Sequence, residues 1–137
     1  MHQTTLEARM FRESARRVRV GDVTINVALA GAGPPVLLLH GFPDSLRLWE
    51  HVAPRIAAAG FQVIAPDLRG FGESDAPVGR RYYAIDRLLG DVTGLLRALD
   101  VRGPLHVVGH DWGAVLAWYF AMSQPALVRT SVVISVG

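Results

Sequence analysis

An aspartate stands at the centre of a glycine-flanked pentapeptide, Gly109-His110-Asp111-Trp112-Gly113. This spacing is that of a nucleophile elbow, a sharp strand-to-helix turn that lifts one side chain above the end of a sheet, with Asp111 where such turns commonly carry serine. The tight turn brings backbone segments together on both sides, so Gly109 and Gly113 are expected where a Cβ would not fit. Because an ionised carboxylate can act as a nucleophile, Asp111 is the candidate catalytic residue.

A second loop, His40-Gly41-Phe42-Pro43-Asp44-Ser45, offers a backbone donor to the same carboxylate. Pro43 biases Phe42 away from the helical region, so the loop can hold the Phe42 N–H in a fixed direction. Together with the Trp112 N–H at the start of the next helix, it gives two donors directed at an oxygen of Asp111, which is the geometry of an oxyanion hole. The same donors and the helix dipole predict that Asp111 is ionised at neutral pH.

Other residues of these loops are expected to shape the backbone rather than to react. This loop-shaping set consists of His40, Gly41, Pro43, Gly109, His110 and Gly113. A third loop, over residues 66–77, is rich in glycine and proline and carries Asp67 and Arg69. We expect those two side chains to satisfy buried backbone groups.

Strands and helices alternate along the chain and position these loops. Arg16–Val20 and Val23–Ala30 are predicted to form an antiparallel hairpin. Apolar runs and helical spacing then predict strands at Val36–Leu39, Phe61–Ala65, Leu105–Val108 and Thr130–Val136, and helices at Leu46–Ala59, Tyr82–Leu99 and Gly113–Gln124. This order predicts an α/β fold, a mostly parallel sheet with helices on both faces. Ligands meet such sheets at the carboxyl ends of the strands, where both candidate loops lie.

Charge and composition narrow the classes of function. The net charge is +2, with +3 in residues 1–20 and −1 in residues 21–137, which argues against a nucleic-acid-binding surface. The absence of cysteine excludes disulfides, thiolate metal sites and cysteine nucleophiles, and favours a cytoplasmic location. No apolar run approaches the roughly 18 residues that span a bilayer, so no membrane span is predicted. Residues 1–15, which lack an apolar segment after their arginines, are expected to form a flexible arm.

Three motifs together resemble the α/β-hydrolase family and, within it, most closely the epoxide hydrolases. They are HGFPDS at 40–45, DLRGFGES at 67–74 and VGHDWGA at 108–114, in the family's order. The resemblance covers residues 16–137. It implies that Asp111 attacks an epoxide carbon to form an alkyl-enzyme ester, and that the amides of Phe42 and Trp112 stabilise the oxyanion when water cleaves this ester to a vicinal diol. A small apolar epoxide is the implied substrate, without a metal ion or an organic cofactor.

The family pattern continues beyond the point where this sequence stops. It adds a helical lid with tyrosines, and then strands that carry an acid and a histidine, so residues 16–137 are expected to be an incomplete core domain. Tyr82, Tyr83 and Tyr119 fall in predicted core helices, and no histidine of this chain is placed as the base that activates water. We expect the chain alone to lack turnover because this base is missing.

Further interpretations compete with this one. A haloalkane dehalogenase uses the same aspartate attack but usually carries asparagine at the position of Phe42. A fluoroacetate dehalogenase would be expected to have arginine in place of Trp112, and a serine esterase would need a hydroxyl at position 111. A non-catalytic fragment, or half of a complemented enzyme, would expose the strand Thr130–Val136 as an edge open to self-association.

Overall fold

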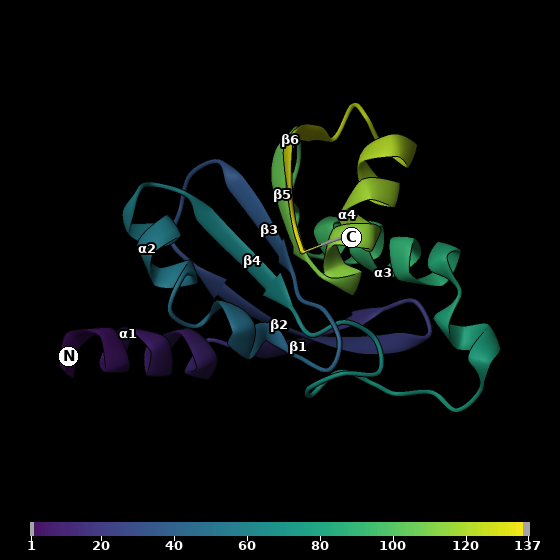
Figure 1. Ribbon diagram of the computed structural model, residues 1–137, viewed down its shortest axis with the longest axis horizontal. Helices are drawn as coiled ribbons and strands as arrows, with labels where there is room; N and C mark the ends of the chain where they lie inside the picture. The colour runs from purple at the N-terminus through teal and green to yellow at the C-terminus, as the bar shows by residue number, and fades with distance from the viewer. Residues whose placement is uncertain (1, 136–137) are drawn as a thin grey trace.

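The computed structural model describes residues 2–135 and contains one six-stranded sheet in the order β1-β2-β4-β3-β5-β6 (Figure 1). The strands are β1 (Arg16–Val20), β2 (Val23–Ala30), β3 (Pro35–Leu39), β4 (Gln62–Pro66), β5 (Leu105–His110) and β6 (Val128–Ile134). β2 pairs antiparallel with both β1 and β4, whereas β4, β3, β5 and β6 pair parallel. The predicted α/β fold, with its antiparallel hairpin and mostly parallel sheet, is confirmed.

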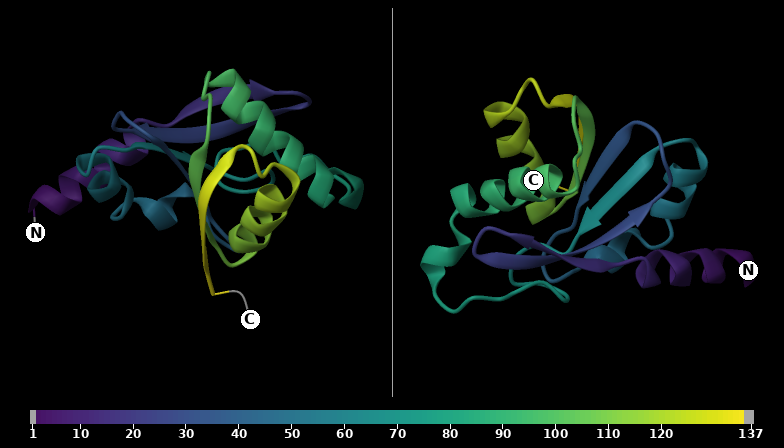
Figure 2. Two further views of the ribbon diagram at one scale, coloured as in Figure 1. Left: turned by 90° about the horizontal axis from the view of Figure 1, so that it is seen from above. Right: turned by 180° about the vertical axis from the view of Figure 1, so that it is seen from behind.

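Helices cover both faces of this sheet (Figure 2). They are α1 (His2–Glu13), η1 (Leu46–Trp49), α2 (Ala53–Ala58), η2 (Arg80–Tyr83), α3 (Ile85–Ala98) and α4 (Trp112–Ser123), where η denotes a 3₁₀ helix. On one face, α3 packs against β1 and α4 against β3, β5 and β6; on the other, α1 packs against β2 and α2 against β4. No helix among residues 2–135 combines the length and the apolar character needed to cross a membrane.

The central strand β3 contributes to two separate cores. Leu37 and Leu39 lie in the hydrophobic cluster under α3 and α4, and Val36 and Leu38 lie in the cluster under α1 and α2. Successive side chains of a strand point to opposite faces, so a continuous apolar run is what a strand buried on both faces requires. This burial holds the carboxyl end of β3, and the loop that follows it, in a fixed position.

The first 15 residues differ from the flexible arm expected from the sequence. His2–Glu13 forms the helix α1, whose Ala8 and Phe11 are buried three residues apart on one face. Phe11 joins the core under α2, and Arg12 forms an ion pair with Glu50. The cause is tertiary packing, because one buried aromatic side chain and one ion pair hold a segment whose composition is mostly polar.

Two predicted helices are each divided in the structure. The predicted helix Leu46–Ala59 consists of η1 and α2, and α2 begins with a proline in its first turn, where the missing N–H has no helical partner to lose. The predicted helix Tyr82–Leu99 is interrupted at Ala84, which has an extended backbone (φ −64°, ψ 150°) between η2 and α3. The last strand, predicted over Thr130–Val136, is observed as Val128–Ile134, and Val136 lies outside the described residues.

Candidate active site

Asp111 lies in a sharp turn between β5 and α4. Its backbone has φ 57° and ψ −122°. For a residue with a Cβ this conformation is unfavourable by about 1–3 kcal/mol, and such residues cluster at functional sites. The Asp111 N–H donates to the carbonyl of Ile134 (3.1 Å), and the Asp111 carbonyl accepts from the N–H of Ala114 (2.9 Å). These bonds hold the turn from β6 on one side and from α4 on the other.

Three glycines allow the backbone segments around Asp111 to approach. A Cβ on Gly109 would lie 2.2 Å from the carbonyl oxygen of Gly113, and a Cβ on Gly113 would lie 2.1 Å from that of Leu39. A Cβ on Gly41 would lie 2.4 Å from the Cβ of Asp111 itself. Side chains at these positions would push apart β3, β5 and the start of α4.

The two backbone amides predicted from the sequence do meet the Asp111 carboxylate. The Phe42 N–H donates to Asp111 Oδ2 at 2.9 Å. The hydrogen bond from Phe42, and after it the bond from the Trp112 N–H, holds the pKa of Asp111 below its ordinary value, because both stabilise the charged form. The carboxylate is therefore ionised at neutral pH. Asp111 is only half-buried, so the carboxylate is also open to a ligand.

His40 links the loop that carries Phe42 to the loop after β4. The ring is fully buried, and its Nε2 accepts the N–H of Leu68 at 2.9 Å. The proton of the neutral ring therefore lies on Nδ1, which donates to the carbonyl of Gly41 at 2.8 Å. Burial lowers the pKa of His40, so the ring stays neutral and both of its nitrogens are occupied by backbone groups.

His110 precedes Asp111 at the end of β5. Its Nδ1 is buried and has no hydrogen-bond partner within the part of the chain that the structure describes. His110 pairs in register with Ile134 of β6, so the two share a face of the sheet. The peptide bond between Phe42 and Pro43 is cis.

The prediction that Asp67 satisfies backbone groups is confirmed. Its buried carboxylate accepts the N–H of Leu46 at 2.7 Å through Oδ1, and the N–H of Glu73 (2.9 Å) and the side-chain amide of Asn26 (3.0 Å) through Oδ2. The Asp67 carbonyl also accepts the hydroxyl of Ser74 at 2.7 Å. One carboxylate thus joins the start of η1, β2 and the loop after β4.

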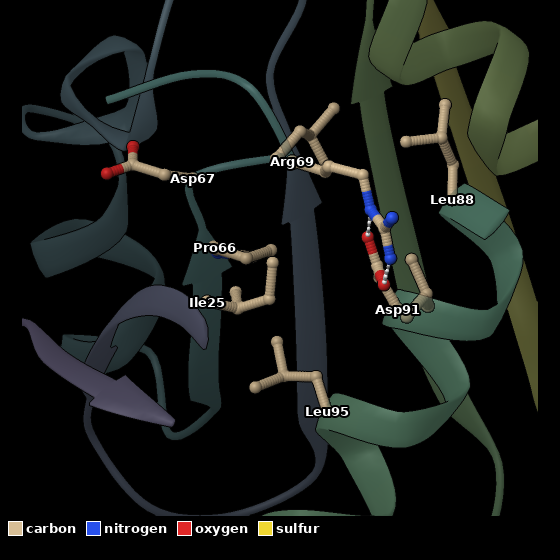
Figure 3. A pocket seen from close by; sticks show the side chains of 9 residues that line it. Ile25, Pro66, Asp67, Arg69, Leu88, Asp91 and Leu95 are labelled. Carbon is tan, nitrogen blue, oxygen red and sulfur yellow. Dashed lines mark hydrogen bonds and ion pairs between the residues drawn. The ribbon is translucent and has the colours of Figure 1, made fainter. Parts of the chain in front are cut away.

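Arg69 has a larger role than the sequence suggested (Figure 3). It donates to Tyr82 O (3.1 Å), as expected of a group that satisfies backbone, but its principal partners are two carboxylates. Asp91 of α3 accepts a pair of bonds at 2.7 and 2.8 Å, and Asp22 in the β1–β2 turn accepts another at 2.9 Å. The pKa of Asp22 is lowered, chiefly by its hydrogen bond from Arg69.

Sequence reasoning missed Asp22 and Asp91 as partners of Arg69. A signal for Asp91 was present, because it lies three residues after Leu88 and four before Leu95, within the apolar stripe of its helix. A carboxylate in a buried stripe needs a cationic partner.

A cavity of about 400 Å³ opens beside the site, between the starts of α3 and α4. Gly41, Phe42 and Trp112 line it on the side of Asp111, and Tyr83, Ile85 and Leu88 line it on the side of α3. The residues on the α3 side belong to none of the motifs, and the sequence alone did not point to them. Within residues 2–135, no group of three or more histidine, cysteine or acidic side chains is placed to hold a metal ion.

Known proteins resemble this chain in sequence. A family model described as alpha/beta hydrolase fold matches residues 34–136. Epoxide hydrolase 2 of Siraitia grosvenorii is 42% identical over 119 residues, which are 87% of this chain and 37% of the relative. An epoxide hydrolase of Caballeronia sordidicola is 43% identical over 108 residues, 79% of this chain and 32% of the relative.

Solved structures agree with the sequence comparison. The crystal structure of an epoxide hydrolase from Vigna radiata superposes with a TM-score of 0.85 at 39% identity, covering 89% of this chain and 39% of that one. The chain therefore spans between 32% and 39% of the length of these three relatives.

Proposed function

Because the chain belongs to the alpha/beta hydrolase fold family, we propose that it carries the nucleophile of an epoxide hydrolase-like enzyme, with Asp111 in that role. The observation that carries this proposal is the pairing of an ionised Asp111 carboxylate, raised in a positive-φ turn, with the Phe42 N–H at 2.9 Å. A serine hydrolase would need a hydroxyl at this position, and the chain has none there.

The proposed reaction has two steps. An Asp111 carboxylate oxygen attacks one epoxide carbon, the ring C–O bond breaks, and the released alkoxide takes up a proton to leave a hydroxyalkyl ester. Water then adds to the ester carbonyl while a base takes one of its protons. The former carbonyl oxygen becomes an oxyanion, which the N–H groups of Phe42 and Trp112 stabilise, and the proton returns to the leaving alkoxide. Collapse of this intermediate releases a vicinal diol and restores the carboxylate.

Within the described residues, Asp111 has no hydrogen-bonded histidine that could activate water for the second step. His40 is occupied on both nitrogens, and the ring of His106 binds Thr130 at 2.6 Å. We therefore propose that this chain, on its own, performs the first step and accumulates the ester.

The test is covalent labelling of the chain with styrene oxide, followed by intact-mass and peptide mass spectrometry. We expect a mass increase equal to one whole epoxide, located on Asp111 and absent from Asp111→Asn. The matched control is Asp100→Asn, which alters another aspartate at positive φ (54°), and it should keep the adduct. Asp100 precedes β5, whereas Asp111 follows that strand at its other end. Labelling that persists in Asp111→Asn, or halide release from a haloalkane without any epoxide adduct, would contradict the proposal.

We also propose that β6 mediates self-association with a second copy of the chain. Among the described residues, β6 pairs only with β5, and its outward side chains Val132 and Ile134 are 50% and 42% exposed. An unpaired edge of β-branched residues favours the addition of another strand.

A further inference from the structure

The helix α1 precedes the motifs that form the candidate site, and it precedes residues 34–136, which match the family model. Its contacts nevertheless reach the segment that follows β3. Phe11 of α1 is buried, and the guanidinium of Arg12 donates to the carboxylate of Glu50. Because a helix of 12 residues is marginal in water by itself, contacts of this kind hold α1 in place.

The element that these contacts reach is η1, which begins directly after the loop 40–45. Leu46 and Trp49, the first and last residues of η1, are buried in the same hydrophobic cluster as Phe11. Glu50 is the cap residue at the end of this short helix. The carboxylate that pairs with α1 therefore belongs to the residue that terminates η1.

Arg12 is the principal cation at the Glu50 carboxylate. Arg47 and His51 also approach it, at 3.9 and 3.5 Å, but their side chains are 69% and 63% exposed. The Arg12 side chain is 34% exposed and that of Glu50 is 17% exposed, so salt screens this pair less. Of the three cations, only Arg12 comes from a distant part of the chain, and it therefore ties the end of η1 to α1.

The start of η1 is held from a different side. The Leu46 N–H donates to Asp67 Oδ1 at 2.7 Å, so the loop after β4 holds this end. Burial of Trp49 adds stability without fixing a direction, because the hydrophobic effect is non-directional. The pair of Arg12 with Glu50 is a directional, charge-assisted hydrogen bond, so it fixes the orientation of η1 about its held start.

The orientation of η1 passes to the Phe42 N–H through two backbone turns. In the first, the N–H of Leu48 donates to the carbonyl of Ser45 at 3.1 Å. In the second, the N–H of Asp44 donates to the carbonyl of Gly41 at 3.0 Å, and Phe42 lies between these two residues. The Phe42 N–H is the group that donates to the candidate nucleophile at 2.9 Å.

Resting on the proposed role of Asp111, we propose that the ion pair of Arg12 with Glu50 orients η1 and thereby aligns the loop 40–45 with the nucleophile. We call α1 with this ion pair the N-terminal brace. Arg12 and Glu50 are positioning residues, because neither side chain lines the cavity beside Asp111. Without the pair, the Phe42 N–H points less accurately at Asp111, and ester formation slows.

The first experiment follows the Phe42 amide proton by NMR in the folded chain and needs no reaction. Its chemical shift in Asp111→Ala defines complete loss of the hydrogen bond. In Arg12→Met, we expect the shift to move at least about a third of the way toward that value, because hydrogen bonds weaken steeply as they lose alignment. Glu50→Gln, which keeps the shape of the side chain, makes the same comparison if Arg12→Met does not fold.

The matched control is Arg9→Met, which breaks an ion pair with Glu13 inside α1 whose two side chains are well exposed. We expect the Phe42 shift to stay where it is in this variant. Arg12→Lys keeps a cation opposite Glu50 and should leave the shift close to that of the wild-type chain. An unmoved Phe42 shift in Arg12→Met, or an equal movement in Arg9→Met, would overturn the N-terminal brace.

The second experiment follows ester formation at Asp111 with styrene oxide. We expect Arg12→Met to slow it about three- to tenfold, since misplacing a positioned group lowers the rate, and Arg9→Met to leave it unchanged. A displaced Phe42 amide with an unchanged rate would overturn the positioning role. A displaced amide in a chain whose Asp111 takes no epoxide would support the N-terminal brace and reject the nucleophile, and an undisplaced amide beside a labelled Asp111 would do the reverse.

Discussion

Arg69→Met tests whether the buried ion pair between Arg69 and Asp91 stabilises the fold only while both charges are present. The change removes the partner of Asp91, whose side chain is 12% exposed, and leaves its charge in an apolar setting. Breaking a buried pair in this way costs about 3–5 kcal/mol. A domain of this size is stable by about 5–15 kcal/mol, so this loss is a large fraction of the total.

The double variant Arg69→Met/Asp91→Leu gives the sharper result. The two side chains border a cavity of about 10 Å³ whose other walls include Ile25, Leu88 and Leu95, so apolar replacements meet apolar neighbours (Figure 3). Replacing both members of a buried pair by apolar residues is often neutral or stabilising. We expect the double variant to recover at least about 2 kcal/mol relative to Arg69→Met.

The measurement is urea unfolding followed by circular dichroism at two protein concentrations, which separates unfolding from association. The matched control is Arg102→Met, which breaks an ion pair of similar length (2.8 Å against 2.7 Å) between side chains that are 86% and 76% exposed. It should cost less than about 1 kcal/mol. The single variant Asp91→Leu completes the comparison. If the losses of unfolding free energy in the two single variants simply add in the double variant, the two charges do not depend on each other and the reasoning is wrong.

Three further predictions concern the site and the exposed strand. Hydrogen bonds from the Phe42 and Trp112 N–H groups lower the pKa of Asp111, so the rate of ester formation should stay constant as the pH falls from 8 and decline only below the ordinary value of 3.8. Mass spectrometry at each pH measures the amount of ester. A decline near pH 5 would contradict the role of Asp111 as the nucleophile. Gly41→Ala places a Cβ 2.4 Å from that of Asp111 and should slow ester formation on the order of 10²-fold, whereas Gly90→Ala, with open space around its position, should not. Val132→Lys, which adds a charge to the exposed face of β6, should shift sedimentation toward the monomer, and an unchanged profile would place self-association elsewhere.

Much of the fold could be predicted because each local signal agreed with the packing. The hairpin boundaries Arg16–Val20 and Val23–Ala30 match the structure at both ends, since the turn residues and the strand pattern point to the same register. The apolar run at β3 indicated burial on both faces, and the structure has it there. Asp111 and the two amides were found together because glycine spacing and a proline constrain the backbone through short-range sterics.

The features that sequence reasoning missed depend on partners distant in the chain. α1 is held by Phe11 and by the ion pair of Arg12 with Glu50, 38 residues away. Arg69 meets Asp22, 47 residues earlier, and this pairing exists only after the sheet places the hairpin turn beside α3. Tyr83 lines the cavity beside Asp111 from a short helix that ends where the chain breaks at Ala84, and the helical periodicity gave no sign of that break.

The order of the strands explains why the loop after β3 serves the site. β3 lies between β4 and β5, so the loop at its carboxyl end adjoins the loops that follow both neighbours. In one direction His40 accepts the N–H of Leu68 after β4, and in the other Phe42 donates to Asp111 after β5. Between them, Gly41 gives its carbonyl to His40 and leaves room for Asp111. The direction of the Phe42 N–H is therefore set in part from β4 through His40, and we expect a change in the loop after β4 to reach the nucleophile along this path of hydrogen bonds.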